Sequence, residues 1–511
     1  MKLIIILCNQ LYEESPILED LDDDDIIVLY EHPLYFTDYK YHKMKLVMHR
    51  ATMKKYYDYL KDNYNNQIIY LEYNVDDITK QVIKKYKNIE SIKIYNPIDH
   101  KIMKEFTNIS KKLSIQLIIF NNPGFICTIE EYTEYLKTNK NKNPYFHHTF
   151  YVWCRKKYDL LMNKDKPIGN KWSFDLDNRL PFPKNYKEEK KQILVNTSKN
   201  SYIKEAKKYV DKNFKNNHGT DEYYLPIDFK GAKKHFKTFL KKRLNNFGPY
   251  EDAVSDKIIF GNHSVLSPLI NIGLITPNYI LEEVSKYYEK NKVKNKVKIQ
   301  SIEGYVRQLF WREFCVLVYL NKNKELETEN FFNHKRLLDN SWYNGSTNID
   351  LIDDIIKKAL KYGWVHHIER LMYIGNFMLI TKTHPKESYK WFMELFIDAY
   401  PWVMVPNVYG MSQFSAGHVM MKRPYFSSSN YINKMSTYKK KYDTYDKIKI
   451  GNTELEWFEV WDSLYYNFIN DNKKYLESNY SSANIVRIWN NKEIKEKEKL
   501  LEISKKYLLE Y

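Results

Sequence analysis

The stretch Leu3-Ile4-Ile5-Ile6-Leu7-Cys8-Asn9-Gln10 decides the fold of the first part of the chain, because an unbroken apolar run stops abruptly at polar residues. Such a run is typical of a strand that is buried on both faces. Helix-length amphipathic segments, Lys43–Asp62 and Ile78–Tyr86, lie between further runs of the same kind. Those further runs are Ile26–Tyr30, Gln67–Tyr73, Ser91–Tyr95 and Ser114–Phe120. Strands that alternate with helices predict a parallel, doubly wound sheet.

The pattern of the chain changes twice after this sheet. From about Thr128 to Pro183 it loosens into charged stretches broken by proline and glycine, which indicates a surface connection. From about Lys184 onward helical periodicity dominates. The clearest segments are Ala232–Phe247, Ile302–Leu320, Leu351–Leu379, Tyr389–Ala399 and the amphipathic Lys492–Tyr511. We predict an α/β domain over residues 1–127, a linker over 128–183 and an all-helical domain over 184–511.

Composition narrows the class of protein. The 81 Lys and Arg residues outnumber the 64 Asp and Glu residues, and the formal net charge of +17 favours a polyanionic partner. A generally lysine-rich surface is the alternative. The four cysteines form no C-x-x-C pair, which is typical of reduced thiols in an intracellular protein. The apolar run at the start is too short for a signal peptide, and no stretch reaches the roughly 18–20 apolar residues of a membrane span.

Two constellations offer chemistry near the middle of the chain. In Asn262–Ile270, the hydroxyls of Ser264 and Ser267 precede a proline at the first turn of a helix, an arrangement that suits an anion. An ordinary N-cap is the alternative. In Glu303–Phe314, Gln308 and Arg312 share one helix face. A core helix with an ion pair is the alternative there.

Two more constellations follow. Between Trp342 and Phe377, the adjacent His366 and His367 point about 100° apart on a helix, so they cannot easily hold one metal ion. A structural histidine pair is the alternative. The last constellation interleaves aromatic residues with lysine and arginine, which suits base stacking beside phosphate contacts, although a buried aromatic cluster has the same pattern. It covers Trp391-Phe392, Asp398–Trp402, Val405–Phe414, Lys422–Tyr425 and Ser429–Met435.

In this order the four constellations resemble the cryptochrome/photolyase family, as S-x-L-S, Q-x-x-W-R-E-F, W-x-x-G and H-H-x-x-R. The resemblance covers nearly the whole chain and is densest from Asn262 to Met435. Longer strings look like the iron–sulfur bacterial cryptochrome and photolyase branch, the prokaryotic (6-4) photolyases. Those strings are Leu160–Asn163, Trp172–Asp175, His366–Phe377 and Pro406–Phe414.

The resemblance implies two chromophores. In this branch the α/β domain holds a ribityl-lumazine antenna, and Asn9, Gln10 and Glu31 fall in the antenna pocket. The helical domain holds a U-shaped FAD, and Met404 falls at the position that faces flavin N5. The residues that match flavin-binding positions are Ser264, Leu266, Ser267, Gln308, Arg312, His367, Arg370 and Asp398.

The resemblance also implies roles in light-driven DNA repair. His367, beside His366, matches the histidine that serves as proton donor in (6-4) repair, with Tyr425 and Tyr431 as partners at the lesion. A flavin supplies the electron, and moving a hydroxyl between bases needs proton transfer, which suits a histidine. A poorly stacked lesion also costs less to flip out than a normal base. Lesion or DNA contacts are expected from Trp311, Met411, Lys422, Arg423, Tyr425, Asn430 and Tyr431, and electron transfer from Trp391, Phe392 and Tyr343.

Three features depart from the branch: the cluster positions, the position that faces flavin N5 and the antenna pocket. The cysteines of its iron–sulfur cluster correspond to Leu351, Lys439, Tyr442 and Glu459, which cannot hold iron as thiolates do, so we predict no cluster and no metal. Met404 replaces a glutamate or asparagine, and a thioether cannot hydrogen-bond a protonated N5 as those groups can. Asn9 replaces an aspartate of the antenna pocket.

Three functions stay open from the sequence. The first is a DNA photolyase, a carbon–carbon lyase, that repairs (6-4) lesions in ultraviolet-damaged DNA as a monomer. The second is a cryptochrome-type blue-light photoreceptor without repair activity, which Met404 favours and the retained His367, Tyr425 and Tyr431 oppose. The third is a cyclobutane pyrimidine dimer photolyase, which needs no histidine proton donor.

Overall fold

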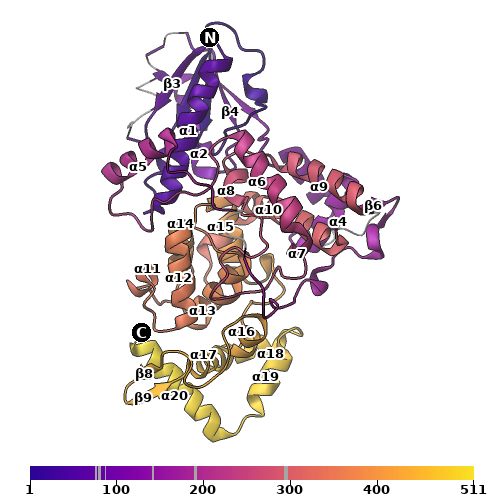
Figure 1. The fold of residues 1–511 in the computed structure, drawn as a ribbon, viewed down its shortest axis with the longest axis vertical. Coiled ribbons are helices and arrows are strands. Elements are labelled where there is room, and N and C mark those ends of the chain that lie inside the picture. Colours follow the sequence, from indigo (N-terminus) through magenta and orange to yellow (C-terminus); the bar gives the residue numbers. More distant parts are fainter. Residues whose placement is uncertain are drawn as a thin grey trace.

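The computed structural model describes residues 1–74, 78, 82–83, 85–86, 88–140, 143–188, 193–292 and 297–510. An α/β domain lies at one end of the molecule, and the last helices of the chain lie at the other (Figure 1). Within the described ranges, no helix combines the length and the apolar character that crossing a bilayer requires. The predicted fold class, a doubly wound parallel sheet followed by a large helical region, is confirmed.

Five parallel strands form the sheet, in the order β3-β2-β1-β4-β5. β1 (Lys2–Leu7) pairs with β2 (Ile26–Tyr30) on one side and with β4 (Ser91–Tyr95) on the other. β3 (Gln67–Leu71) and β5 (Gln116–Phe120) form the two edges. The strand order reverses beside β1, and ligands of such sheets bind at the carboxyl ends of strands near this point.

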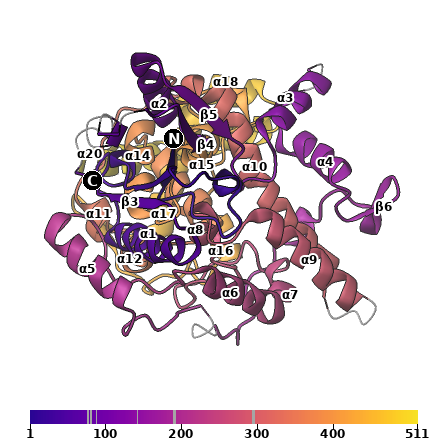
Figure 2. The ribbon, with the colours of Figure 1, turned by 90° about the horizontal axis from the view of Figure 1, so that it is seen from above.

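Helices cover the sheet, as Figure 2 shows from above. α1 (Lys43–Asn63) matches its predicted bounds, and α2 (His100–Leu113) connects β4 with β5. α5 (Ser201–Asn213), from beyond the linker, packs against α1. Residues 79–81 and 84 of the predicted helix Ile78–Tyr86 lie outside the described residues.

The segment predicted as a loose linker carries two helices, α3 (Ile129–Thr138) and α4 (His147–Lys157). Thr128 and Glu131 cap α3 reciprocally, with each side chain accepting the other residue's backbone N–H, so the start of this helix is fixed locally. Beyond them lies the two-stranded ribbon of β6 (Met162–Asn163) and β7 (Lys166–Pro167). The polar composition of the segment did not predict these elements. Its aromatic residues are enough to anchor them to the core.

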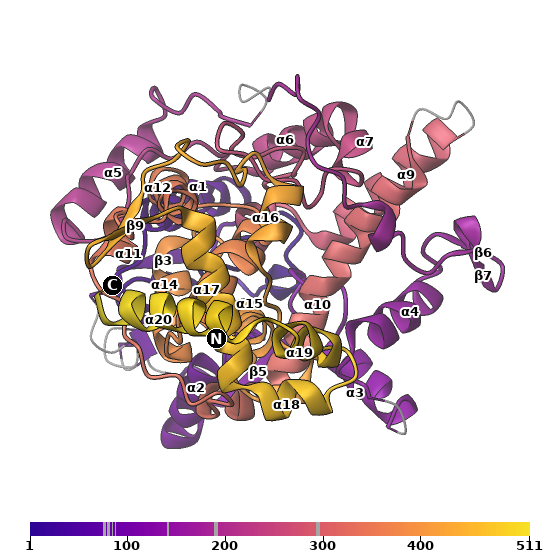
Figure 3. The same ribbon diagram turned by 90° about the horizontal axis from the view of Figure 1, so that it is seen from below.

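The rest of the described chain is largely helical, and Figure 3 shows its C-terminal layer from below. The long predicted helix Leu351–Leu379 is interrupted, because Gly363 takes a positive φ of 58° and ends α12. A small hairpin of β8 (Ile448–Ile450) and β9 (Thr453–Leu455) interrupts the helices near the end. The helices are α6 (Phe229–Lys242), α7 (Leu244–Phe247), α8 (Ser267–Asn271), α9 (Pro277–Lys292), α10 (Ile299–Thr328), α11 (Ser341–Asn344), α12 (Asp350–Tyr362), the π-helix η7 (Glu369–Gly375), α13 (Asn376–Ile380), α14 (Pro385–Leu395), α15 (Pro401–Met404), the π-helix η8 (Val405–Ser412), α16 (Ser429–Met435), α17 (Trp457–Asp471), α18 (Lys473–Ser478), α19 (Ala483–Asn490) and α20 (Ile494–Glu510).

A buried carboxylate joins the α/β domain to the helical region. Glu313 of α10 accepts hydrogen bonds from the backbone N–H groups of Ile126 and Cys127 at 3.0 and 3.1 Å, and from the Tyr132 hydroxyl at 3.0 Å. Its neighbour Arg312 donates to the carbonyl oxygen of Gly124 at 2.7 Å. The loop after β5 is therefore fixed to the longest helix of the chain, which places the two parts of the fold relative to each other.

Candidate active site

The centre of the site is an ion pair that joins η7 to the segment after α14. The Arg370 guanidinium donates to both carboxylate oxygens of Asp398, with Nη1–Oδ1 at 2.9 Å and Nη2–Oδ2 at 3.1 Å. Ser267, the first residue of α8, donates its hydroxyl to Asp398 Oδ2 at 2.6 Å. Bidentate pairing fixes the plane of the carboxylate as well as its position. Three predicted flavin-binding residues thus meet at one point.

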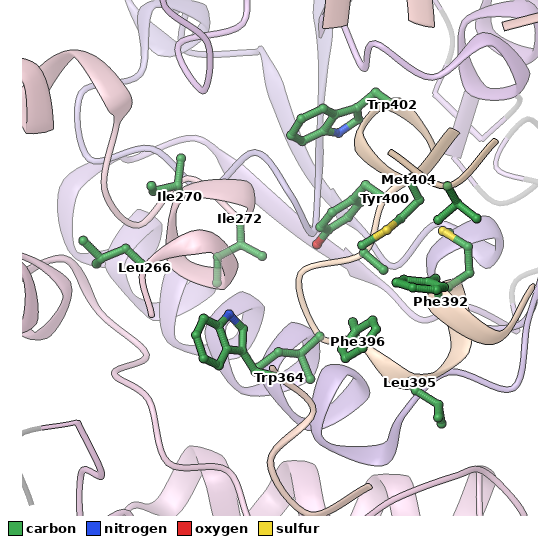
Figure 4. Packing of buried hydrophobic residues seen from close by; sticks show 14 of the residues in the cluster. Leu266, Ile270, Ile272, Trp364, Phe392, Leu395, Phe396, Tyr400, Trp402 and Met404 are labelled. Atoms are coloured by element: carbon green, nitrogen blue, oxygen red, sulfur yellow. The ribbon is translucent and has the colours of Figure 1, made fainter. Parts of the chain in front are cut away.

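Aromatic side chains surround this pair. The Arg370 guanidinium lies 4.1 Å from the ring centre of Phe396, and the Trp364 indole Nε1 donates to Ser267 Oγ at 3.3 Å. Figure 4 shows Leu266 of the turn before α8 on one side of Trp364 and Phe396 on the other, with Met404 close to Tyr400 and Phe392. Such walls limit access of water to the ion pair, which strengthens its electrostatics.

A strained turn precedes α8. Val265, a β-branched residue, has a positive φ of 55°, a conformation that costs energy and tends to persist where the surrounding structure enforces it. His235 Nε2 contacts the Ser264 carbonyl oxygen at 2.9 Å, and Arg243 donates from Nε to the His263 carbonyl oxygen at 3.2 Å. Both residues come from α6 and its C-cap, so this helix holds the shape of the turn.

The two adjacent histidines face opposite environments. His366 is buried, stacks on His263 with ring centres 4.7 Å apart, and accepts no hydrogen bond at Nδ1 from described residues. His367 is exposed to solvent. Nevertheless desolvation, assisted by Arg370 and Arg307, lowers its pKa to about 4. The protein atoms and the two arginines around the imidazole therefore disfavour its charged form, although water reaches the side chain.

α10 contributes a second polar cluster. Gln308 donates from Nε2 to Glu251, whose other carboxylate oxygen lies 3.4 Å from Arg307 Nη2. Burial raises the pKa of Glu251 to about 7, and Arg307 opposes that shift. Arg312 on the same helix face lies between the rings of Phe125 and Trp402. Gln308 and Arg312, the predicted i, i+4 pair, therefore contact different partners.

Glu251 gives a testable pH dependence. Because its pKa is raised above that of the unfolded chain, its contribution to stability is complete below about pH 4.5 and is lost as the pH rises through about 7. Replacement by glutamine removes this loss. We expect the melting temperature of Glu251→Gln to gain on the wild type as the pH rises from about 5 to about 8. Thermal unfolding at several pH values measures the gain, and a constant difference would contradict it.

The predicted DNA-contact residues differ in how far they are exposed. Lys422, Arg423 and Asn430 are exposed, whereas Tyr425 and Tyr431 are half-buried. Trp311 is half-buried and donates from Nε1 to Asn407 Oδ1 at 3.0 Å, and Met411 is buried in η8. The interleaved aromatic and basic residues thus divide into an exposed cationic set and a partly covered aromatic set.

Two of the three predicted electron-transfer residues, Trp391 and Phe392, form part of a chain of rings. Trp391 is fully buried, and its ring centre lies 5.3 Å from that of Phe392 and 5.7 Å from that of Phe396. On its other side, Trp391 donates from Nε1 to the Trp342 carbonyl oxygen at 2.7 Å. Tyr343 is half-buried and stacks on His218 at 4.6 Å. The ring of Phe396 continues this path to Arg370, and the ring of Trp342 continues it on the far side of Trp391.

Comparisons with known proteins now bear on this site. Residues 4–223 match the family described as deoxyribodipyrimidine photo-lyase-related protein, and residues 305–447 match the FAD binding domain of DNA photolyase. A (6-4) photolyase of Agrobacterium fabrum is 28% identical over 499 residues, covering 96% of this chain and 95% of that protein. The chain belongs to the photolyase/cryptochrome family.

Two further likenesses agree with this family. An uncharacterised protein of Acanthamoeba polyphaga mimivirus is 35% identical over 186 residues, which cover 35% of this chain and 94% of that protein. A crystal structure of a bacterial class III photolyase from Agrobacterium tumefaciens superposes with a TM-score of 0.53 at 14% identity, covering 85% of this chain and 86% of that one. This structural likeness supports the fold alone.

The residues around the strained turn fit the FAD that the photolyase/cryptochrome family uses. Arg243 Nη1 and Asn262 Nδ2 are buried donors without a hydrogen-bond partner among the described residues, and both flank Ser264. A buried donor left unpaired is costly, and a phosphate-bearing ligand would satisfy both. Arg243, Asn262, Trp364 and Phe396 were not predicted from the sequence. Asn262 begins the constellation Asn262–Ile270 and Trp364 lies within Trp342–Phe377, so these two carried a signal that could have identified them.

The antenna residues are held by the protein itself. Glu31 is fully buried and accepts from Arg50 Nη1 at 3.0 Å, Tyr70 at 2.6 Å and Tyr209 at 2.8 Å. The Gln10 carboxamide oxygen accepts from the Leu7 N–H, and Asn9 donates to the Tyr35 hydroxyl. In contrast, Asn9 Oδ1 is buried and has no hydrogen-bond partner among the described residues. The ribityl-lumazine antenna stays a prediction.

The four positions that correspond to cluster cysteines lie on elements that meet. Leu351 is on α12, Glu459 is near the start of α17, and the segment with Lys439 and Tyr442 contacts both helices. Its contacts are the Asp446 N–H to Asp350 Oδ2 at 3.0 Å and the Tyr442 ring at 5.3 Å from the Phe458 ring. No group of three or more metal-ligating side chains is found among the described residues.

We predict that the purified protein carries no iron–sulfur cluster. None of the four side chains is a thiolate, and thiolates are what hold such clusters. Elemental analysis of protein purified without chelators should find iron far below one atom per chain. Stoichiometric iron, with the visible absorption of a cluster, would show that other ligands hold it.

Proposed function

We propose that this protein is a light-driven, FAD-dependent (6-4) photolyase. His367 carries the proposal, because it is solvent-accessible, its surroundings lower its pKa to about 4, and it lies two residues before the π-helix that carries Arg370. π-helical segments occur frequently at functional sites, because the extra residue re-aims side chains. Similarity over nearly the whole chain to a protein named (6-4) photolyase supports the same function.

The residues that would hold FAD are those of the strained turn, the Arg370–Asp398–Ser267 group and α10. When bound, FAD supplies the light-driven electron. The chain's own residues orient it: Arg243, Asn262 and Ser264 bind anionic or hydroxyl groups, and Arg370 keeps the Asp398 carboxylate in one plane. Trp364 and Phe396 exclude water from this pair.

His367 would move the proton that (6-4) repair requires. In the free protein its imidazole is neutral at physiological pH, because desolvation and the two arginines lower its pKa to about 4. An anionic ligand that enters the site favours the protonated form and raises this pKa. The proton donor would therefore become loaded when the substrate and cofactor are in place.

The exposed cations Lys422 and Arg423 would contact phosphates on either side of the lesion, and Tyr425 and Tyr431 would stack against the flipped bases. Burial raises the pKa of the Tyr425 and Tyr431 hydroxyls, so both remain neutral donors at physiological pH. The ultraviolet-damaged strand is thus the proposed partner, with the protein acting as a monomer.

A cryptochrome-type photoreceptor is the second candidate, and Met404 favours it. Met404 is buried beside Tyr400 and Phe392 and presents a thioether where a carboxylate or amide would hydrogen-bond a protonated nitrogen (Figure 4). Such surroundings would change the redox properties of a bound flavin, and a sensor tolerates this change more readily than a repair enzyme.

Dark binding separates these functions without any light step. The FAD-loaded protein is titrated against duplexes that carry a (6-4) photoproduct, a cyclobutane dimer or no lesion. We expect the (6-4) duplex to bind at least about ten-fold more tightly than the undamaged one, because its bases cost less to flip out. Preference for the cyclobutane dimer would assign the other repair reaction, and equal affinity for all three would favour the photoreceptor.

A further inference from the structure

One face of α1 lies against the segment that carries Asp398. Lys45 and His49 are four residues apart and therefore share that face. Lys45 Nζ donates to the Ala399 carbonyl oxygen at 2.5 Å, and His49 Nε2 lies 2.8 Å from the Tyr400 hydroxyl. Just before the helix, the His42 N–H donates to the Glu394 carbonyl oxygen at 2.7 Å. The α/β domain thus contacts residues 394–400 at three points.

Lys45 is an unusual residue to find at this contact. It is fully buried, and none of the described carboxylates lies within ion-pair distance of its Nζ; the contacts are the Ala399 carbonyl oxygen and the rings of Tyr41 and Tyr400 at 4.3 and 4.7 Å. Burying an ammonium without a carboxylate is costly, and an apolar side chain would fill the space at lower cost. Because burying this lysine is costly, its presence indicates that its charge has a role.

The Lys45 ammonium contacts a residue that is next in the chain to the flavin site. Ala399, which Lys45 holds, follows Asp398, and Asp398 shares its carboxylate between Arg370 and Ser267. The Asp398 backbone carbonyl is fixed from the other side by Asn271 Nδ2 at 2.9 Å. The segment therefore sits between α1 of the α/β domain and α8 of the helical region.

We propose that Lys45 is a positioning residue of the flavin site, through which the α/β domain holds Asp398 in place and adds positive charge behind it. The inference rests on the proposed role of Asp398 in binding FAD. It gives the α/β domain a part in flavin binding that is independent of any antenna chromophore.

The titratable groups around Lys45 make its charge sensitive to pH. Desolvation lowers the pKa of Lys45 to about 7, opposed by Cys8 at the end of β1 and by Asp398. Tyr41, Tyr400 and His49 also face it, and burial keeps all three neutral near pH 7, since the pKa is well raised for the tyrosines and well lowered for His49. Lys45 is therefore charged below about pH 7 and neutral above it.

The test compares Lys45→Met with Lys54→Met in the full chain. Lys54 is half-buried on the same helix but lies over the ring of Tyr70 in β3, so it controls for losing a lysine from α1. FAD affinity of each reconstituted protein is measured by flavin fluorescence at about pH 6 and about pH 8.5, on either side of the pKa of Lys45. Thermal unfolding of each apoprotein is measured in parallel.

We expect Lys45→Met to weaken FAD binding at least about five-fold at the lower pH, a typical size for coupling between sites. The difference should narrow at the higher pH, where Lys45 of the wild type is neutral. The melting temperature of the variant should not fall, because a buried charge without an ion-pair partner has been removed. Lys54→Met should bind FAD like the wild type.

Three results would overturn the inference: equal FAD affinity of Lys45→Met and the wild type at both pH values, equal weakening in both variants, or parallel loss of stability and affinity in Lys45→Met. The readout also separates the inference from the proposed function. A wild type that binds FAD but repairs no (6-4) lesion refutes the function and leaves the role of Lys45 to be judged by affinity. A wild type that repairs the lesion while Lys45→Met binds FAD equally well refutes only the role of Lys45.

Discussion

Replacement of His367 by alanine should lower (6-4) repair by about 10²–10⁴-fold, the usual contribution of a positioned general acid, while FAD remains bound. His367 takes no part in the hydrogen bonds of the Arg370–Asp398–Ser267 group, so its loss leaves those contacts intact. Repair is measured under blue light with an oligonucleotide that carries one (6-4) photoproduct. Flavin absorption of the same sample confirms that the cofactor is present.

The matched control is His148→Ala, which removes an exposed histidine of α4. This variant should repair like the wild type. If His367→Ala also repairs at the wild-type rate, the proton comes from another group and the proposed role of His367 fails. If His367→Ala repairs a cyclobutane dimer as well as the wild type does, the enzyme belongs to the reaction that needs no proton donor.

Replacement of Arg370 by methionine should abolish FAD binding and destabilise the fold by about 3–5 kcal/mol, because it leaves the Asp398 carboxylate buried without its charged partner. The cation–aromatic contact with Phe396 is lost as well. Chemical unfolding monitored by circular dichroism measures the stability, and fluorescence titration measures the affinity for FAD.

Two further variants interpret the Arg370 result. Arg487→Met removes an exposed arginine of α19 and should change the free energy of unfolding little. Asp398→Asn keeps the shape of the acid and removes its charge, so it should recover part of the stability when combined with Arg370→Met. An Arg370→Met protein that is as stable as the wild type and still binds FAD would show that the pair is not the centre of the site.

The sequence predicted the sheet well, because a fully buried strand leaves an unbroken apolar run such as Leu3–Leu7 that few other structures produce. It also placed the ends of α1 closely. The helix expected over Leu351–Leu379 was wrong, since an amphipathic pattern continues past Gly363 although the backbone turns there. Local periodicity does not register a single residue with positive φ.

Residues of the candidate site were predicted where they belong to the stretches that carry the family resemblance. Arg370 and Asp398 came from quoted motifs, and the structure pairs them. Arg243 and Glu251 were missed, because neither lies in those stretches and only the fold brings them to His263 and Gln308. Lys45 was missed for a similar reason: on a helix wheel it is one more lysine, and only the fold reveals that it is buried against Ala399.

The most direct test of the proposed function is light-driven repair by the FAD-loaded wild type. The protein is incubated with a duplex that carries a single (6-4) photoproduct, with and without blue light, and the recovered normal bases are measured by chromatography. We predict complete restoration of both pyrimidines in the light and none in the dark, with much slower reversal of a cyclobutane dimer. Bound FAD with no restoration of the (6-4) lesion under light would contradict the account.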